Sequence, residues 1–199
     1  MPNRRRFLQS GLALPAFGPL AGLSLSGPAS AQGRPTLTLD RFVFDNRFPE
    51  AVELARFVAR EGVPLAETDG DMTELWCGHL APQWRRRPLP LAGMTTSNGL
   101  FVLSTLAADH RMRVIYRGVH EPAPEGVETL TGPVGLIEQA SDSDPRLWSP
   151  LLARAIAHCP AGPAPLTTFK RRIPPARSRR DEPLVTWIIA DRGSGSSAA

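Results

Sequence analysis

The stretch RFVFDNRFPEAVELARFVAREGVPLAET, residues 41–68, decides the fold. It opens with a short run, Arg41–Phe44, that is typical of a β-strand. A helix is expected next, because Pro49 suits a first helical position and apolar residues then recur at intervals of three and four. These apolar residues are Ala51, Leu54, Ala55 and Val58. Gly62 ends the helical pattern, and Val63–Ala66 reads as a second short strand.

The same alternation of strand and helix continues beyond this stretch. Asp71, with Glu74 three residues later, predicts the cap of a helix that runs to Leu80 and then ends or kinks near Pro82. The following predicted elements are a strand at Pro88–Met94, a helix capped near Ser97 or Asn98, and a strand at Met112–Tyr116. Strands that alternate with helices are typical of a parallel sheet covered by helices.

The pattern is weaker after Tyr116. Residues 122–133 read as a loop with a short element near 127–130, and Ser149 with Pro150 predicts the start of a helix. The sequence therefore predicts a single α/β domain with a largely parallel, open sheet of about five strands and helices on both faces. Its predicted parts are an α/β domain over 32–169, a basic Pro/Arg-rich segment over 170–183, a final strand over 184–191 and a flexible tail over 192–199.

Polar side chains follow each of the first four predicted strands. Ligands of open parallel sheets bind outside the carboxyl ends of the strands, so these residues are the candidate ligand-binding set. They are Asp45, Arg47, Asp69, Asp71, Thr95, Thr96, Ser97, Asn98, Arg117 and His120. Helix capping is an alternative role for Asp71, Ser97 and Asn98.

An anion is one ligand that this set could bind. The helix that opens near Ser97 would offer its N-terminal N–H groups and dipole, and Arg47 or Arg117 could add a guanidinium. The sequence contains neither G-x-G-x-x-G nor a P-loop, so no nucleotide cofactor is predicted, nor any other cofactor.

Catalysis is a second interpretation of the same loops. His120 would act as an acid or base, with Asp45 or Asp71 orienting its ring. A serine hydrolase is disfavoured, because the residues around Ser97 lack the flanking glycines of G-x-S-x-G.

No metal site is predicted. Asp69, Asp71 and Glu74 bring three carboxylates close in sequence, but hard cations take about six oxygen ligands and the spacing does not match an EF-hand. The four histidines are not paired at zinc-binding spacing, and a solvated turn with a helix cap explains the acidic residues.

The two cysteines, Cys77 and Cys159, leave two alternatives open. They could pair as a disulfide in an oxidising compartment, or each could be a small apolar residue on a helix. Two cysteines are too few for a disulfide-framework fold, and no C-x-x-C pair is present.

The N-terminal 31 residues have the three parts of a secretory signal in order. A charged region is followed by apolar residues 12–25 and by the small-residue site Ala29-Ser30-Ala31. The charged region contains Arg4, Arg5, Arg6, Phe7 and Leu8. This run resembles the signal of the twin-arginine translocation (Tat) pathway, which exports folded proteins. The resemblance implies the Tat machinery as a partner, cleavage after Ala31 and a periplasmic location.

The basic composition belongs mostly to the ends of the chain. The chain has 23 Lys and Arg against 19 Asp and Glu, and removal of the three leader arginines leaves 20 basic residues and a net charge of +1. Nucleic acid is therefore not a predicted partner. No stretch after the leader is long and apolar enough to span a membrane.

Three functions are expected from these observations. The leading one is an exported protein that binds a small molecule, such as an anion, or serves an accessory role through the loops after the strands. The alternatives are an enzyme of unrecognised type that uses His120, and an interaction module that docks an acidic partner on basic residues 170–180.

Overall fold

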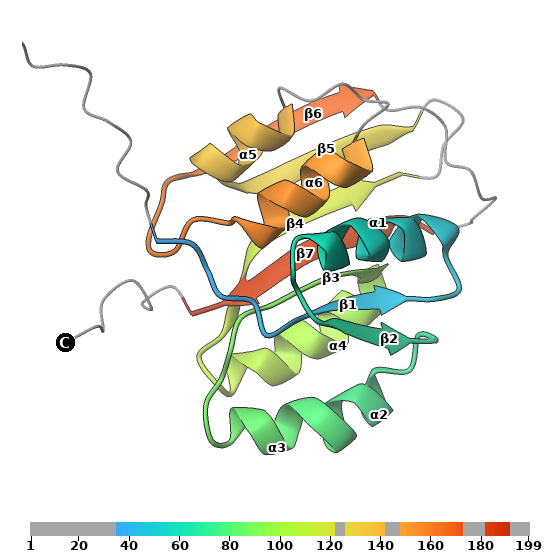
Figure 1. Cartoon of the computed structure of the whole chain (residues 1–199), viewed down its shortest axis with the longest axis vertical. Coiled ribbons are helices and arrows are strands. Elements are labelled where there is room, and N and C mark those ends of the chain that lie inside the picture. Colours follow the sequence, from blue (N-terminus) through green and yellow to red (C-terminus); the bar gives the residue numbers. More distant parts are fainter. Residues whose placement is uncertain (1–34, 122–125, 142–147, 173–181, 192–199) are drawn as a thin grey trace, which may run out of the picture. The chain divides into compact units, whose positions relative to one another are not determined.

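A computed structural model describes residues 35–121, 126–141, 148–172 and 182–191. The leader residues and the predicted tail 192–199 lie outside these ranges, as do 173–181 of the basic segment. The described residues form one seven-stranded sheet in the order β2-β1-β3-β7-β4-β5-β6 (Figure 1). The strands are β1 Arg41–Asp45, β2 Leu65–Thr68, β3 Leu91–Thr96, β4 Arg113–His120, β5 Val127–Pro133, β6 Leu166–Arg172 and β7 Leu184–Ala190.

The sheet is mixed rather than largely parallel, which corrects the predicted arrangement of about five strands. β1 runs parallel to β2 and β3, as the sequence predicts. β7 lies between β3 and β4 and is antiparallel to both, and β5 is antiparallel to β4 and β6. All seven residues of β7 are buried, which fits its central place in the sheet.

The helices lie on both faces of the sheet. They are α1 Pro49–Arg60, α2 Met72–Leu75, α3 Ala81–Trp84, α4 Ser97–Ala108, α5 Val134–Ser141 and α6 Trp148–Ala157. A π-helical turn, η1 Trp76–Leu80, joins α2 to α3, so the predicted helix continues through Pro82 to Trp84. None of the described helices combines the length and the apolar character that a membrane crossing requires.

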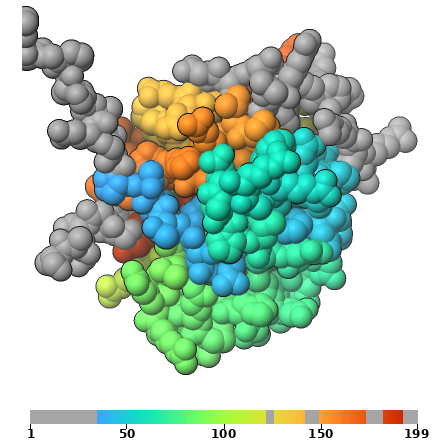
Figure 2. Space-filling model, in the orientation of Figure 1, coloured from blue at the N-terminus to red at the C-terminus, as the bar shows by residue number. Residues whose placement is uncertain are grey.

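Each face of the sheet has its own apolar core. On one face, α1 and α6 pack over Phe42, Tyr116 and Ile188, and Figure 2 shows α1, α5 and α6 on the surface of this side. On the other face, α4 and the α2–α3 segment pack over Val43 and Trp187. The two cores place helices on both faces of the sheet, and the hollows described below lie at the edges where the strands begin and end.

The two cysteines lie on opposite faces and both thiols are free, so the Cys77–Cys159 disulfide is not formed. Cys159 is buried in the core under α1 and α6. Cys77 is exposed in the η1 turn, next to Trp76, which packs against the other core. The sheet separates the two sulfur atoms, and this is the physical reason that they do not pair.

The first basic residues of the predicted segment 170–183 belong to a strand. Lys170, Arg171 and Arg172 continue β6, which pairs along its length with β5. Arg171 Nε donates a hydrogen bond of 2.6 Å to Glu128 Oε2 on β5. The boundary predicted at residue 169 is therefore wrong, because Leu166–Arg172 forms one continuous strand.

Candidate functional site

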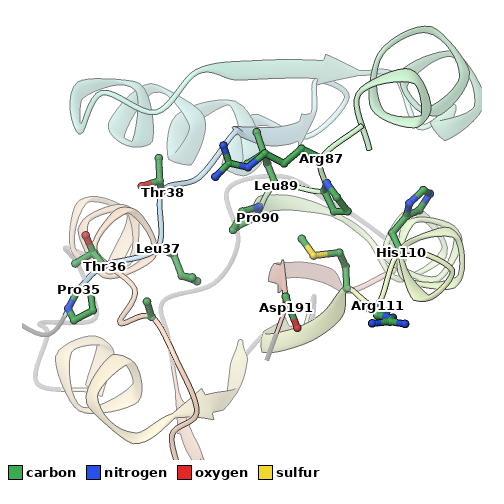
Figure 3. Close-up of a pocket in the computed structure, with 13 residues that line it drawn as sticks. Pro35, Thr36, Leu37, Thr38, Arg87, Leu89, Pro90, His110, Arg111 and Asp191 are labelled. Carbon is green, nitrogen blue, oxygen red and sulfur yellow. The ribbon is translucent and has the colours of Figure 1, made fainter. Parts of the chain in front are cut away.

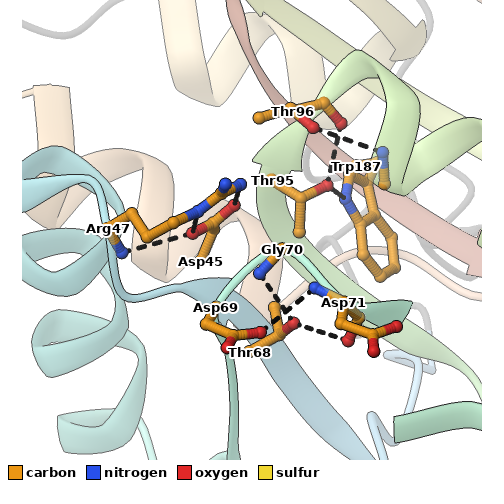
Figure 4. Close-up of polar contacts among 10 residues, drawn as sticks. Asp45, Arg47, Thr68, Asp69, Gly70, Asp71, Thr95, Thr96 and Trp187 are labelled. Atoms are coloured by element: carbon orange, nitrogen blue, oxygen red, sulfur yellow. Dashed lines mark hydrogen bonds and ion pairs between the residues drawn. The ribbon is translucent and has the colours of Figure 1, made fainter. Parts of the chain in front are cut away.

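The predicted ligand residues of the first three strands do come together at one edge of the sheet. We call this the carboxyl edge, because β1, β2 and β3 end there (Figure 4). Asp45 of β1 lies opposite Thr68 of β2. Phe44 of β1 pairs with Met94 of β3, and Thr95 comes directly after Met94. The strand ends thus bring residues from three separate loops into one neighbourhood.

Arg47 and Asp45 form a two-pronged ion pair at this edge. Arg47 Nε lies 2.9 Å from Asp45 Oδ1, and Arg47 Nη2 lies 2.7 Å from Oδ2. The hydrogen bonds from Arg47 to buried Asp45 raise the pKa of the guanidinium above its usual value. The guanidinium also lies against Gly70, whose φ of +101° and lack of a Cβ leave room for it. Arg47 is therefore committed to Asp45 and is a poor ligand for a second anion.

Asp69 stabilises a turn, and Asp71 caps the N-terminus of α2. The Thr73 N–H donates to Asp71 Oδ1 at 2.7 Å, and this hydrogen bond lowers the pKa of the Asp71 carboxyl. The Asp71 N–H donates to Asp69 Oδ1 at 3.2 Å. Thr68 Oγ1 accepts from the Gly70 N–H and donates to the Asp71 carbonyl. The predicted capping role of Asp71 is confirmed.

The hydroxyl groups of the residues at the start of α4 also form hydrogen bonds within the protein. Trp187 Nε1 donates to Thr95 Oγ1 at 3.0 Å, and Thr95 Oγ1 donates to the Thr96 carbonyl. The cap of α4 is Thr96, whose Oγ1 accepts from the Gly99 N–H at 3.3 Å, rather than the predicted Ser97 or Asn98. A helix N-terminus that carries its own cap has fewer N–H groups to offer to an anion.

His120 and Arg117 lie apart from this cluster. Both belong to β4, which is separated from β1 by β3 and β7. Three strand spacings place His120 roughly 14 Å from the end of β1. The side chain of His120 is buried, whereas Arg117 is exposed. The structure thus does not bring His120 together with Asp45 or Asp71, as the predicted acid–base arrangement requires.

His120 instead belongs to a buried polar network across four strands, which the sequence did not predict. His120 Nε2 and Thr186 Oγ1 are hydrogen-bonded at 3.0 Å, and His120 Nδ1 lies 3.1 Å from Glu128 Oε1. Burial by itself raises the pKa of Glu128, but His120 and Arg171 outweigh it and hold that pKa below its usual value. The side chains of His120 and Glu128 are only 1% exposed. The contacts of the network therefore replace water as the polar partners of these groups.

A small hollow of about 330 Å³ lies at the carboxyl edge. Its lining residues are Asn46, Glu67, Thr68, Asp69, Asp71, Glu74, Leu75 and His79. Four carboxylates make this hollow unfavourable for the anion that the sequence suggested. No group of three or more His, Cys, Asp or Glu side chains within the described ranges is arranged to hold a metal ion.

A larger groove of about 520 Å³ lies at the opposite edge of the sheet (Figure 3). We call it the amino-edge groove, because its walls come from the segments that precede β1, β3 and β4 and from the residue that follows antiparallel β7. The lining residues are Pro35, Thr36, Leu37, Thr38, Arg87, Pro88, Leu89, Pro90, His110, Arg111, Met112, Ala161 and Asp191. Leu37 and Met112 of the lining are buried, whereas Arg87, Arg111 and Asp191 are exposed. A combination of apolar and charged lining residues is typical of a small-molecule site.

The charge of this groove is mainly positive. Arg87 and Arg111 are exposed, and neither makes an ion pair with any residue in the described part of the chain. Asp191 is the acidic residue of the lining. Two guanidinium groups that keep their hydrogen-bond donors available favour a carboxylate or phosphate ligand.

Arg111 has a backbone conformation that arginine rarely adopts. Its φ is +60°, and no other non-glycine residue in the described ranges has a positive φ. The Met112 N–H donates to the Ala107 carbonyl and the Arg111 N–H to the Ala108 carbonyl, which closes the C-terminus of α4. Glycine is the usual residue at this position, and a side chain there costs about 1 kcal/mol. Strained residues of this kind are concentrated at functional sites.

His110 connects the groove to a cluster of aromatic rings. Its ring centroid lies 5.6 Å from that of Trp84 and 5.9 Å from that of Trp76. Trp84 is buried, so His110 is backed by a rigid part of the core. A ligand in the groove would contact a side chain that itself contacts two tryptophans.

Comparisons of the chain with protein-family models, with curated proteins and with solved structures found no match.

Proposed function

We propose that this chain is an exported protein that binds a small organic anion in the amino-edge groove. The observation that carries the proposal is the pair Arg87 and Arg111, two arginines without ion-pair partners in the described structure, at the rim of a hollow of about 520 Å³. Export is proposed from the twin-arginine leader, which directs the protein to the periplasm.

The groove fits a small organic molecule better than a bare ion. Its volume is within the usual range of roughly 300–1,000 Å³ for small-molecule sites. Leu37, Leu89 and Met112 offer apolar contact beneath the arginines. A ligand with a carboxylate and an apolar body would therefore satisfy both parts of the lining.

We favour binding over catalysis because the groove lacks an activated nucleophile among the described residues. Its hydroxyl groups belong to Thr36 and Thr38, and within the described ranges no hydrogen bond joins either of them to His110. Covalent catalysis by a hydroxyl group requires an adjacent base to remove its proton. The groove offers positive charge and apolar contact, and these support the binding of a ligand.

Calorimetric titration of the mature chain from Gln32 tests this function. We expect hexanoate and benzoate to bind, and we expect Arg87→Gln and Arg111→Gln each to lower the affinity about tenfold through loss of charge-assisted hydrogen bonds. Arg86→Gln is the matched control, because Arg86 is exposed but does not line the groove. Absence of binding to the wild-type chain would refute the proposal, as would equal losses in all three variants.

Export is tested separately with the full-length chain. We expect the double change Arg4→Lys and Arg5→Lys to retain the protein in the cytoplasm, because the Tat signal is defined by its arginine pair. Cell fractionation measures the distribution. Equal amounts of wild-type and variant protein in the periplasm would contradict a Tat route.

A further inference from the structure

A second hollow, of about 300 Å³, adjoins the amino-edge groove. We call it the apolar hollow. Its lining residues are Leu37, Ile115, Pro133, Gly162, Pro163, Ala164, Leu166 and Asp191. Asp191 is the sole charged residue of this lining, and the other side chains are apolar.

Leu37 and Asp191 line both hollows. The two hollows are therefore neighbours across Leu37, which is itself buried. The arginines line only the amino-edge groove, and Ile115, Ala164 and Leu166 line only the apolar hollow. Together the two hollows have a cationic end and an apolar end.

Leu166 leaves apolar surface exposed to water at the apolar hollow. It is 50% exposed at the start of β6, one of four large apolar side chains of the described structure with substantial exposure. Contact with an apolar ligand group would remove this surface from water. The same ligand group would also contact Pro133 and Pro163, which belong to the lining and whose rings fix their backbone φ.

From this juxtaposition we infer that the ligand is an anionic amphiphile with a linear acyl chain. Its carboxylate is attracted to the cationic end by the charges of Arg87 and Arg111, and its acyl chain passes Leu37 into the apolar hollow. This inference rests on the proposed function and specifies the class of ligand.

The apolar hollow adds a selectivity. A second carboxylate buried beside Ile115, Ala164 and Leu166 would lose its hydration without gaining a cationic partner from these side chains. The site therefore selects a monocarboxylate with an apolar end over a dicarboxylate of the same length.

A series of linear carboxylates tests the inference by calorimetric titration of the mature chain, each ligand below its micelle concentration. From butanoate to octanoate, we expect each added methylene to raise the affinity about fourfold, as burial of a CH₂ group predicts. Octanedioate should bind more weakly than octanoate. Ala164→Trp should flatten the series by filling the apolar hollow, while butanoate binding stays unchanged.

Two further variants distinguish loss of the apolar contact from a folding defect. Leu166→Gln removes apolar surface at an exposed position and should also reduce the chain-length dependence. Leu65→Gln is the matched control, because Leu65 is 41% exposed and lines neither hollow. Unfolding curves show whether each variant is folded.

The failures of the two proposals are distinguishable. Equal affinity for butanoate and octanoate would overturn the acyl-chain inference and leave an organic-anion site intact. No binding of any carboxylate would overturn both proposals. Dependence of the affinity on acyl-chain length that persists in Ala164→Trp and Leu166→Gln would place the acyl chain elsewhere and overturn this inference.

Discussion

Arg47 and Arg111 show how the partner of a residue decides its role. Both are exposed arginines at an edge of the sheet, and both follow a strand or helix terminus. Arg47 makes two hydrogen bonds to the carboxylate of Asp45, whereas Arg111 has no ion-pair partner among the described residues. The sequence predicts a ligand role for Arg47 and does not single out Arg111, because only the folded backbone determines which carboxylate each arginine can reach.

Arg111 is expected to reduce the stability of the fold. We predict that Arg111→Gly raises the free energy of unfolding by about 1 kcal/mol, because glycine adopts a φ of +60° without steric cost. Urea unfolding measures the change. Arg113→Gly is the control, since Arg113 is an exposed strand residue where glycine should lower stability.

The two cysteines should differ sharply in reactivity. Burial raises the pKa of the Cys159 thiol to about 12, whereas Cys77 is exposed. Only the thiolate reacts with Ellman's reagent, so we predict that one thiol reacts rapidly in the native protein at pH 8 and the second reacts only on unfolding. Cys77→Ser should remove the fast reaction. Slow reaction of both thiols in the folded wild-type protein would be inconsistent with the burial pattern.

At the scale of single elements, the helix starts were more predictable than the strand pairings. Pro49 and Asp71 mark the beginnings of α1 and α2 through local steric and hydrogen-bonding effects that a sequence expresses directly. β6 has no such local mark. Its sequence, LTTFKRR, contains three basic residues, and its place in the sheet depends on pairing with β5 more than 30 residues earlier.

The cap of α4 provides a local test. We predict that Thr96→Ala lowers the free energy of unfolding by about 1 kcal/mol, because the Gly99 N–H loses its acceptor. Ser97→Ala and Asn98→Ala, at the positions that the sequence suggested, should change stability by less than about 0.5 kcal/mol. Urea unfolding of the three variants compares them. A larger loss for Asn98→Ala than for Thr96→Ala would be evidence against the observed cap.

The pairing of β4, β5 and β6 has a charged centre in Glu128. We predict that Glu128→Gln lowers the free energy of unfolding by about 3 kcal/mol at pH 7, because Arg171 loses its counter-charge and His120 loses its carboxylate partner. Urea unfolding at a series of pH values measures this difference.

The difference should depend on pH with a definite sign. The folded-state pKa of Glu128 is lower than that of an unfolded glutamate, about 4.3. Its stabilising effect is therefore complete above the unfolded value and is lost as the pH falls through the folded value. The gap between wild type and Glu128→Gln should narrow below about pH 4. A gap that stays constant from pH 7 to pH 3 would contradict the charged network.

At the scale of the whole molecule, the two edges of the sheet have opposite character. The carboxyl edge holds ion pairs, caps and an acidic hollow, and its polar residues are used by the fold itself. The amino edge holds a larger groove with two arginines that form no ion pair with the described residues. The mixed order of strands contributes to this difference, because the end of antiparallel β7 places Asp191 among the starts of β1, β3 and β4.

This arrangement explains how far the sequence could predict the site. The rule that ligands bind at the carboxyl ends of parallel strands correctly brought Asp45, Asp69 and Thr95 together. It did not show that the polar groups at this edge hydrogen-bond to one another. The residues of the amino-edge groove precede strands, apart from Asp191, which follows β7, and they come from segments as distant as Thr36 and Asp191. Only the positive φ of Arg111 distinguishes one of them, and that is a property of the folded backbone.

The most direct test of the central claim is the affinity of Arg111→Gly for hexanoate, measured by calorimetric titration beside wild type. The substitution is expected to make the fold more stable, so a loss of binding cannot be attributed to unfolding. We predict an affinity about tenfold lower than that of wild type, because the groove loses one of its two guanidinium charges. An affinity equal to that of wild type in this stabilised variant would contradict an anion site in the amino-edge groove.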